Sequence, residues 1–197
     1  MTRRQTSVVA DSHAHSSKEA LRKELRPLRA QVDSATEKIV VNHLADFLGQ
    51  IDGVFLFYRS MPNELQLDSL ADRLGWERFA TTRTPESGPL TVHSASGIME
   101  RHKFGYMQPL KDAAKFPLNS ISVALVPALA IDTRGNRLGH GAGYYDELLS
   151  RISADCLRIG VITERFIFDQ LPHESHDVPM THLASEAGVR PVKAVSD

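Results

Sequence analysis

The 197-residue chain has little that would tie it to a membrane, to an oxidising compartment or to nucleic acid. Its single cysteine, Cys156, excludes an internal disulfide framework and fits a reducing cytoplasm. No stretch reaches the roughly 18 apolar residues of a membrane span, and the N-terminal segment lacks the apolar core of a secretory signal. A net charge of −1 gives no reason to expect binding to nucleic acid or to an acidic membrane. We therefore expect a cytoplasmic protein that binds neither.

The length and composition favour one folded domain. A chain of 197 residues with 42% hydrophobic and 24% charged residues is ordinary for a globular protein of one sizeable domain. Residues 1–15 are polar and have no apolar periodicity, so we predict a disordered tail there. A single domain is expected over residues 16–197.

Two helices are predicted in the first fifty residues. Ser16 with Glu19, and Ser34 with Glu37, have the spacing of capping boxes at helix N-termini. Pro27 should kink or end the first helix early, because proline lacks the N–H group that the helix needs. Apolar residues recur every three or four positions in the second helix, which predicts that it is amphipathic.

Helices and short apolar strands alternate along the rest of the chain. The predicted elements are strand 54–58, helix 66–74, strands 78–82, 90–93 and 122–126, a helix from 144 to near 151, and strand 157–162, with a loop at 104–109. This alternation indicates an α/β sheet with helices on both faces.

The most informative segment is residues 137–146, RLGHGAGYYD, which follows a buried strand pattern and leads into a helical one. Glycines at three alternate positions let the backbone approach a ligand closely and adopt positive φ. A helix that starts at Tyr144 would direct its unpaired N–H groups at this loop, which favours anion binding. The spacing matches neither a Walker A loop nor the dinucleotide fingerprint. A flexible surface loop is the alternative, but the Tyr-Tyr-Asp run that follows at once favours a phosphate-binding loop of another kind.

Five segments together resemble the 5-formyltetrahydrofolate cyclo-ligase family, also called methenyltetrahydrofolate synthetases. They are residues 18–22 (KEALR), 58–64 (YRSMPNE), 126–132 (VPALAID), 137–146 (RLGHGAGYYD) and 171–177 (LPHESHD). The resemblance implies ATP- and Mg²⁺-dependent cyclisation of 5-formyltetrahydrofolate to 5,10-methenyltetrahydrofolate, with release of ADP and phosphate. It also implies a three-layer sandwich with a mostly parallel central sheet, NagB/RpiA/CoA-transferase-like. We expect the two small-molecule substrates as partners, and a monomer or weak homodimer.

The resemblance also implies roles for individual residues. The catalytic residues would be Lys18, Arg137 and Asp146, and the metal ligands Asp146 and Asp177. The ATP site would comprise Lys18, Glu19, Ala20, Leu21, Arg22, Arg137, Leu138, Gly139, His140, Gly141, Ala142, Gly143, Tyr144 and Tyr145. The folate site would comprise Arg59, Glu64, His140, Gly141, Ala142, Gly143 and Tyr144.

The residues alone leave these roles open. Lys18 and Arg22, one turn apart on a helix, could form an ordinary solvated face. Asp146 could be a first-turn charge that stabilises the helix dipole, and Asp177 a turn residue. Glu64 could be an exposed loop acid.

Two other functions also stay open. The same kind of scaffold serves sugar-phosphate isomerisation and acyl-CoA transfer, which need a differently placed carboxylate base or nucleophile and no ATP. A non-catalytic folate- or nucleotide-binding protein is the other alternative. Its one hint is Gln108, at a position where the family often has glutamate. ATP-dependent turnover separates the ligase from both.

Overall fold

The computed structural model describes residues 17–29 and 33–193, so the predicted tail at residues 1–15 lies outside the described residues. The helices are α1 (Lys18–Leu28), α2 (Ser34–Leu48), α3 (Asp68–Leu74) and α4 (Tyr144–Ser150). The strands are β1 (Val54–Phe57), β2 (Phe79–Arg83), β3 (Thr91–Ser94), β4 (Met99–Arg101), β5 (Met107–Pro109), β6 (Ile121–Pro127), β7 (Ala130–Asp132), β8 (Arg137–Leu138), β9 (Leu157–Val161), β10 (Ile167–Phe168), β11 (His182–Ser185) and β12 (Gly188–Pro191).

A seven-stranded sheet with the order β12-β11-β9-β6-β1-β2-β3 forms the centre of the molecule. Its inner strands from β11 to β2 run parallel, and the edge strands β12 and β3 run antiparallel to their neighbours. Two smaller sheets flank it, with the orders β10-β7-β8 and β4-β5. The mostly parallel sheet predicted from the sequence is therefore confirmed.

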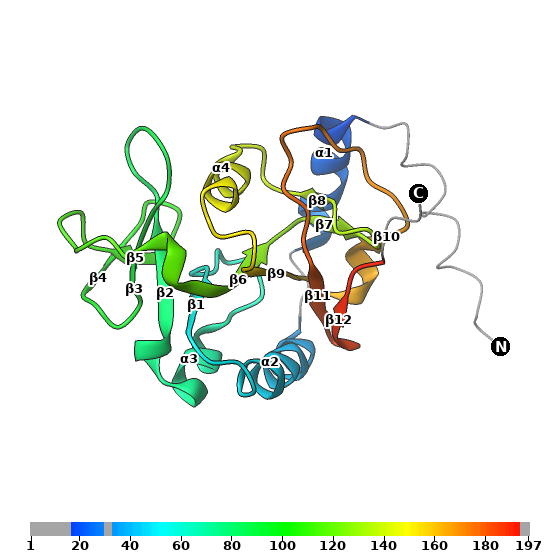
Figure 1. Ribbon diagram of the computed structural model, residues 1–197. Coiled ribbons are helices and arrows are strands. Elements are labelled where there is room, and N and C mark those ends of the chain that lie inside the picture. The colour runs from blue at the N-terminus through cyan, green and yellow to red at the C-terminus, as the bar shows by residue number, and fades with distance from the viewer. Residues whose placement is uncertain (1–16, 30–32, 194–197) are drawn as a thin grey trace.

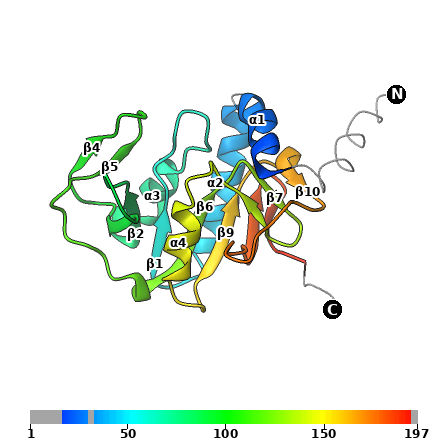
Figure 2. The ribbon, with the colours of Figure 1, turned by 90° about the horizontal axis from the view of Figure 1, so that it is seen from above.

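Helices cover both faces of the central sheet (Figure 1). In β1, Phe55 and Phe57 pack in the core with α2 and α3, whereas Leu56 packs in the other core with α1 and α4. This alternation follows from the period of two residues in a strand. Seen from above, α4 lies over the central sheet between β1 and β9, and α1 lies near the small sheet β10-β7-β8 (Figure 2). The predicted helices on both faces are confirmed, and the NagB/RpiA/CoA-transferase-like label stays a prediction.

Both helix caps lie one residue away from the predicted ones. Ser17, not Ser16, caps α1 by accepting a hydrogen bond from the Ala20 N–H group. Asp33, not Ser34, caps α2 and accepts from the third N–H group of that helix at 2.7 Å. The predicted Ser34–Glu37 box does not form, because Asp33 is an equally good cap and stands next to Ser34. Ser16, of the other predicted box, lies outside the described residues.

Other boundaries differ in small ways. The first helix runs one residue past Pro27 before it ends. The predicted loop at 104–109 is wrong at its end, where residues 107–109 form β5 and pair with β4. No helix among the described residues is long and apolar enough to cross a membrane.

Candidate active site

A cavity of about 630 Å³ opens at the carboxyl ends of β1, β2 and β6, within the usual size range of ligand sites. Its walls come from α1, the loop after β1, the end of β2, the β4–β5 hairpin, the segment 139–146 and the loop 174–177. Ligands in open α/β sheets bind at the carboxyl ends of the strands. The cavity is therefore where this fold places a substrate.

The glycine loop, residues 139–143, forms one wall, and α4 begins at Tyr144 as predicted. Gly141 and Gly143 have φ of +104° and +70°, which a residue with a side chain rarely adopts. A Cβ atom on Gly139 would lie 2.5 Å from a guanidinium nitrogen of Arg137. Among the described residues, no acceptor binds the backbone N–H groups of residues 140–143. The loop thus exposes a row of backbone donors.

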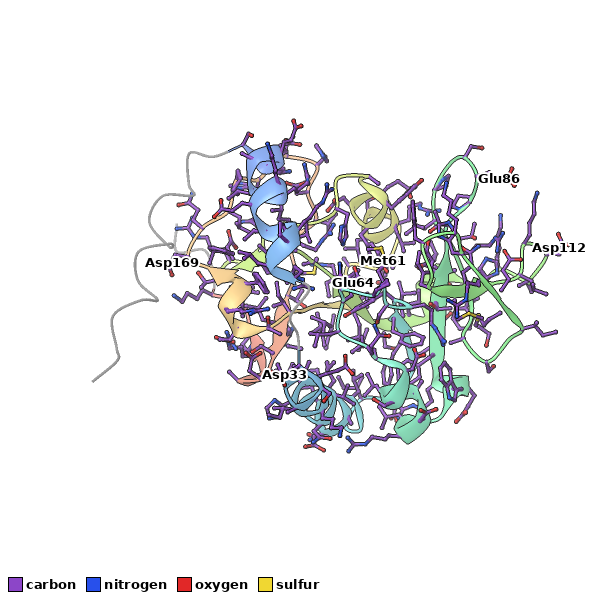
Figure 3. The ribbon with its side chains drawn as sticks, turned by 180° about the vertical axis from the view of Figure 1, so that it is seen from behind. Asp33, Met61, Glu64, Glu86, Asp112 and Asp169 are labelled. Atoms are coloured by element: carbon purple, nitrogen blue, oxygen red, sulfur yellow. The ribbon has the colours of Figure 1, made fainter. Side chains whose placement is uncertain are left out.

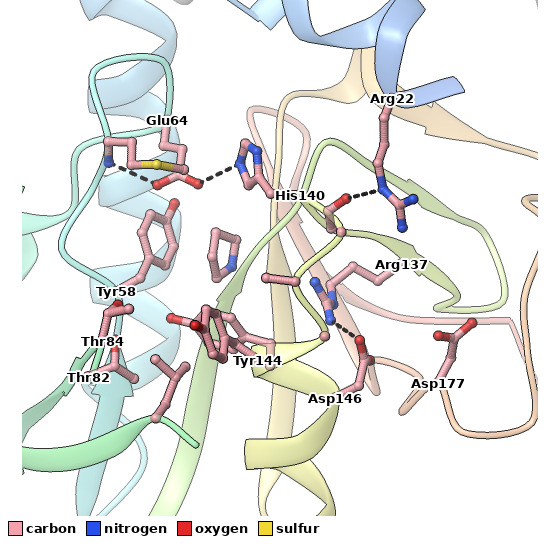
Figure 4. A pocket seen from close by; sticks show the side chains of 18 of the residues that line it. Arg22, Tyr58, Glu64, Thr82, Thr84, Arg137, His140, Tyr144, Asp146 and Asp177 are labelled. Carbon is pink, nitrogen blue, oxygen red and sulfur yellow. Dashed lines mark hydrogen bonds and ion pairs between the residues drawn. The ribbon is translucent and has the colours of Figure 1, made fainter. Parts of the chain in front are cut away.

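Charged groups gather on the side of the cavity next to this loop (Figure 4). Arg137 donates from Nη2 to Asp146 at 3.0 Å, and its side chain is only 5% exposed. Within the described part of the chain, the buried Arg137 Nε atom has no hydrogen-bond partner. A buried donor without a partner is costly, so this guanidinium is suited to a ligand oxygen.

Lys18 and Asp177 form the second ion pair of this side, with 2.6 Å between Nζ and Oδ2. Burial by itself would raise the pKa of Asp177. Hydrogen bonds from Lys18 and from the Glu174 N–H group outweigh burial, and the pKa is lowered. Asp177 is therefore ionised at neutral pH, as a metal ligand has to be.

The two predicted metal ligands are linked through the backbone. The N–H group of Val178, next to Asp177, donates to Asp146 Oδ1 at 3.3 Å. Glu174 and His176 lie close by, and their ligand atoms and that of Asp177 lie within 4.8 Å of one another. Each carboxylate oxygen can accept more than one interaction. The carboxylate oxygens of Asp146 and Asp177 are of the kind that Mg²⁺ takes as ligands.

The opposite side of the cavity carries Glu64, whose residue is only 8% exposed (Figures 3 and 4). Its Oε2 atom accepts from the Met61 N–H group at 2.9 Å, and its Oε1 atom lies 3.3 Å from His140 Nε2. Figure 4 shows His140 between Glu64 and the charged side. Glu64 is thus buried and is held by its own turn and by His140, so the alternative of an exposed loop acid is excluded.

Tyrosines and threonines make the rest of this side uncharged. Tyr58 donates its hydroxyl to the Leu65 carbonyl, and burial raises the pKa of Tyr58 well above its usual value. Burial likewise raises the pKa of Tyr145. Both phenols therefore stay neutral at physiological pH. Arg59 also lines the cavity, but its guanidinium pairs with Asp68 at 3.0 Å.

Most of the predicted site residues line this one cavity. They are Lys18, Glu19, Arg22, Arg59, Glu64, Arg137, Gly139, His140, Gly141, Ala142, Gly143, Tyr144, Tyr145, Asp146 and Asp177. Three residues predicted for the ATP site do not line the cavity. Leu21 and Leu138 are buried in the core, with 0% and 1% exposed, and Ala20 is exposed on α1 away from the cavity lining.

Sequence reasoning missed the wall formed by β2 and the β4–β5 hairpin. Thr82 and Thr84 line the cavity from the end of β2, and Phe104 and Tyr106 line it from the hairpin. The Thr84 and Tyr106 hydroxyls lie 2.8 Å apart, which joins these two elements. No local motif marks these residues. Their position depends on the strand order, which places β2 beside β1.

Comparisons with known proteins identify the family of the chain. Residues 14–186 match the model of the 5-formyltetrahydrofolate cyclo-ligase family. The chain is 46% identical over 90 residues to the 5-formyltetrahydrofolate cyclo-ligase of Mycolicibacterium smegmatis, an alignment that covers 44% of this chain and 45% of that relative. It is 26% identical over 177 residues to the enzyme of the same name from Haemophilus influenzae, covering 83% of this chain and 94% of that relative.

Solved structures show the same fold. The NMR structure of Aquifex aeolicus 5,10-methenyltetrahydrofolate synthetase matches with a TM-score of 0.74 and 23% identity, covering 91% of this chain and 95% of that one. The 5,10-methenyltetrahydrofolate synthetase from Mycoplasma pneumoniae matches with a TM-score of 0.70 and 19% identity, covering 87% and 99%. At these identities the structures support the fold alone. The family match over residues 14–186 identifies the chain as a member of the 5-formyltetrahydrofolate cyclo-ligase family, and as an enzyme of that family, as its motifs predict.

Proposed function

We propose that the protein catalyses the ATP- and Mg²⁺-dependent cyclisation of 5-formyltetrahydrofolate to 5,10-methenyltetrahydrofolate, with release of ADP and phosphate. One observation carries the proposal. A single cavity joins two parts. One has a glycine loop with exposed N–H groups and the ion pairs Lys18–Asp177 and Arg137–Asp146, and the other is a wall of tyrosines and threonines with one buried glutamate. Such a cavity has room for a triphosphate on one side and a flat heterocycle on the other.

The proposed reaction has two steps. The formyl oxygen on N5 attacks the γ-phosphorus of ATP, and ADP leaves. N10 then attacks the activated carbon, gives up its proton, and phosphate leaves with the former formyl oxygen. Such phosphoryl transfer depends on positioning and charge stabilisation more than on covalent chemistry by the protein. The mechanism needs no side chain to attack the substrate, and none of the proposed roles is that of a nucleophile.

The charged side of the cavity would bind the nucleotide. The N–H groups of the glycine loop would donate to phosphate oxygens, and the unpartnered Arg137 Nε atom would add a charged donor. Lys18 would bring a second cation from α1. Asp146 and Asp177 would hold Mg²⁺, which when bound neutralises part of the phosphate charge. These residues would together hold the γ-phosphate near the formyl oxygen.

The uncharged side would bind the folate. The Met61 N–H group fixes the Oε2 atom of Glu64. The Oε1 atom, which lies near His140, would accept hydrogen bonds from N–H groups of the pterin ring. A buried carboxylate with a fixed orientation discriminates strongly in favour of a ligand that supplies donors. The neutral phenols of Tyr58 and Tyr145 lie beside it without adding charge.

Phosphate release tests the proposal. With Mg²⁺, ATP and 5-formyltetrahydrofolate together, phosphate and methenyl product should appear in equal amounts, and neither substrate alone should support release. Equal phosphate release from ATP alone would identify an ATPase instead. A folded protein that releases no phosphate with both substrates would overturn the ligase proposal.

Gln108 was the one hint of a non-catalytic protein, and its position in the structure does not support that interpretation. Its side chain is buried, with 4% exposed, and does not line the cavity. Its amide donates to Glu100 at 3.2 Å and accepts from the Thr84 N–H group at 3.3 Å. Gln108 thus supports the hairpin, and its neutral side chain removes no charge from the site. The cytoplasmic location, the monomeric or weakly dimeric state and the lack of nucleic-acid or membrane partners stay predictions.

A further inference from the structure

Two arginines of α1 hold the glycine loop from outside. Arg22 donates from Nε to the Gly139 carbonyl at 2.9 Å, and Arg26 donates from Nη2 to the His140 carbonyl at 2.8 Å. They stand four residues apart and so share one face of the helix. Their acceptors are consecutive carbonyls of the loop.

Arg26 differs from Arg22 in its position. Arg22 lines the cavity, whereas Arg26 is exposed and does not. Arg26 lines a neighbouring groove between α1 and the loop, which shares Arg22, His140 and Gly141 with the cavity and also includes Lys23. A ligand in the cavity would therefore have no direct contact with the Arg26 guanidinium. Any effect of Arg26 on that ligand has to pass through the loop or through long-range charge.

The contact to the loop has a geometric consequence. In a trans peptide the carbonyl and the following N–H group point in opposite directions, and no cis peptide is present among the described residues. With the carbonyls of residues 139 and 140 turned toward α1, the N–H groups of His140 and Gly141 point away from α1. Neither N–H group has an acceptor in the described part of the chain. Successive N–H groups that point the same way form an anion-binding nest.

We infer that Arg26 is a positioning residue for the phosphate loop. By holding the His140 carbonyl, it keeps the Gly141 N–H group turned toward the bound phosphates without touching them. The glycines make the loop able to rotate its peptide units, so an external contact is needed to fix one orientation. This inference rests on the proposed function of the loop as the ATP site.

Three variants separate positioning from charge. Arg26→Ala removes both the donor and the charge, and Arg26→Gln keeps an N–H donor without the charge. Lys23→Ala removes a charge from the same groove, and Lys23 makes no hydrogen bond or ion pair with the described residues. Because Arg26 is exposed, its variants should fold, which circular dichroism and thermal melting can verify.

We expect Arg26→Ala to raise the KM for ATP about tenfold, the effect of losing one charged hydrogen bond, and to leave the KM for folate unchanged. Arg26→Gln should recover most of the ATP affinity, and Lys23→Ala should change it less than about twofold. Titration calorimetry with Mg²⁺ and ATP gives the same comparison without turnover.

Two results would overturn the inference. One is an unchanged ATP affinity in Arg26→Ala. The other is an equal loss in all three variants that disappears at high salt, because that pattern reports net charge alone. If the wild type binds ATP and is active, and Arg26→Ala binds ATP equally well, only this inference is wrong. A wild-type protein that binds no ATP removes the proposed function as well.

Discussion

At the scale of single residues, the charged groups of the cavity are already paired within the protein. Asp146 pairs with Arg137, and Lys18 pairs with Asp177. Removing one member of a buried pair leaves the other without a partner, which costs more than the pair contributes. Substitutions that keep the shape of the side chain are therefore the more informative ones.

Asp146→Asn is the test of the metal site. Asparagine keeps an oxygen that can accept from the Val178 N–H group, but it removes the charge that Mg²⁺ needs and the acceptor of Arg137. Thermal melting shows whether the variant stays folded. We expect turnover to fall about 100-fold or more. Steady-state rates at several Mg²⁺ concentrations measure this. Asp155→Asn, at an exposed position, is the matched control. Full activity in Asp146→Asn would remove this residue from the metal site.

Lys18→Ala tests the nucleotide contact from α1. Loss of a cation that donates to phosphate should weaken ATP about tenfold, while folate binding changes little because Glu64 lies on the other side of the cavity. Separate titrations of ATP and folate measure the two affinities. Lys23→Ala controls for the loss of a positive charge on the same helix. An unchanged ATP affinity would remove Lys18 from the nucleotide contacts and leave it only as the ion-pair partner of Asp177.

The residues of the charged side could be predicted because contiguous motifs carry them. The resemblance to the family pointed to Lys18, Arg137 and Asp146, whereas their spacing alone left their roles open. Thr84 and Tyr106 could not be predicted, because their approach to the cavity depends on how β2 and the hairpin pack.

At the scale of elements, the order strand, glycine loop and helix places the glycine loop in the wall of the cavity. The loop lies between β8 and α4, and α1 closes its outer side. Elements with long apolar patterns were predictable, among them β6 and α2. The two- and three-residue strands β7 and β8 were not, because alternation over so few positions cannot be told from chance. They nevertheless set where the glycine loop begins.

Gly141→Val tests the loop as an element. At φ of +104° a β-branched residue is strained, and its Cβ atom would meet the Arg22 guanidinium at 3.4 Å. We expect nucleotide binding to fall at least about tenfold while the sheet stays folded. Calorimetric titration with Mg²⁺ and ATP measures it. Gly97→Val is the control, since Gly97 is exposed and does not have positive φ. Normal ATP binding in Gly141→Val would contradict the assignment of the loop.

At the scale of the whole molecule, one buried histidine links stability to pH. His93 on β3 is 2% exposed, and its ring nitrogens lie 3.0 Å from the Ala114 carbonyl and 2.8 Å from the Thr91 hydroxyl. Burial lowers the pKa of His93 below its ordinary value of 6.5. The unfolded chain thus takes up a proton at a higher pH than the folded one. The contribution of neutral, buried His93 to the free energy of unfolding is complete above pH 6.5. It is lost as the pH falls toward the lower pKa that His93 has in the folded protein.

His93→Gln removes this titration. We expect the difference in the free energy of unfolding between neutral and mildly acidic pH to be smaller in this variant than in the wild type. Urea unfolding at a series of pH values measures it. His43→Gln, at a partly buried position on α2, serves as the control. An identical pH dependence in the wild type and His93→Gln would show that His93 does not carry the effect.

The global arrangement was only partly predictable from the sequence. The alternation of helices and strands indicated a parallel sheet with helices on both faces, and the structure has it. The strand order, with β6 between β1 and β9, could not be read from local patterns because it depends on packing between distant segments. That order brings the segments after β1, β2 and β6 to one cavity.

The most direct test of the central claim is the near-ultraviolet absorbance of the purified protein with 5-formyltetrahydrofolate and Mg²⁺, recorded with and without ATP. The proposed function predicts that the absorbance of the methenyl product grows only when ATP is present. A folded protein that gives no methenyl absorbance with ATP, or the same growth without it, would contradict the assignment of ATP-dependent cyclo-ligase activity to this cavity.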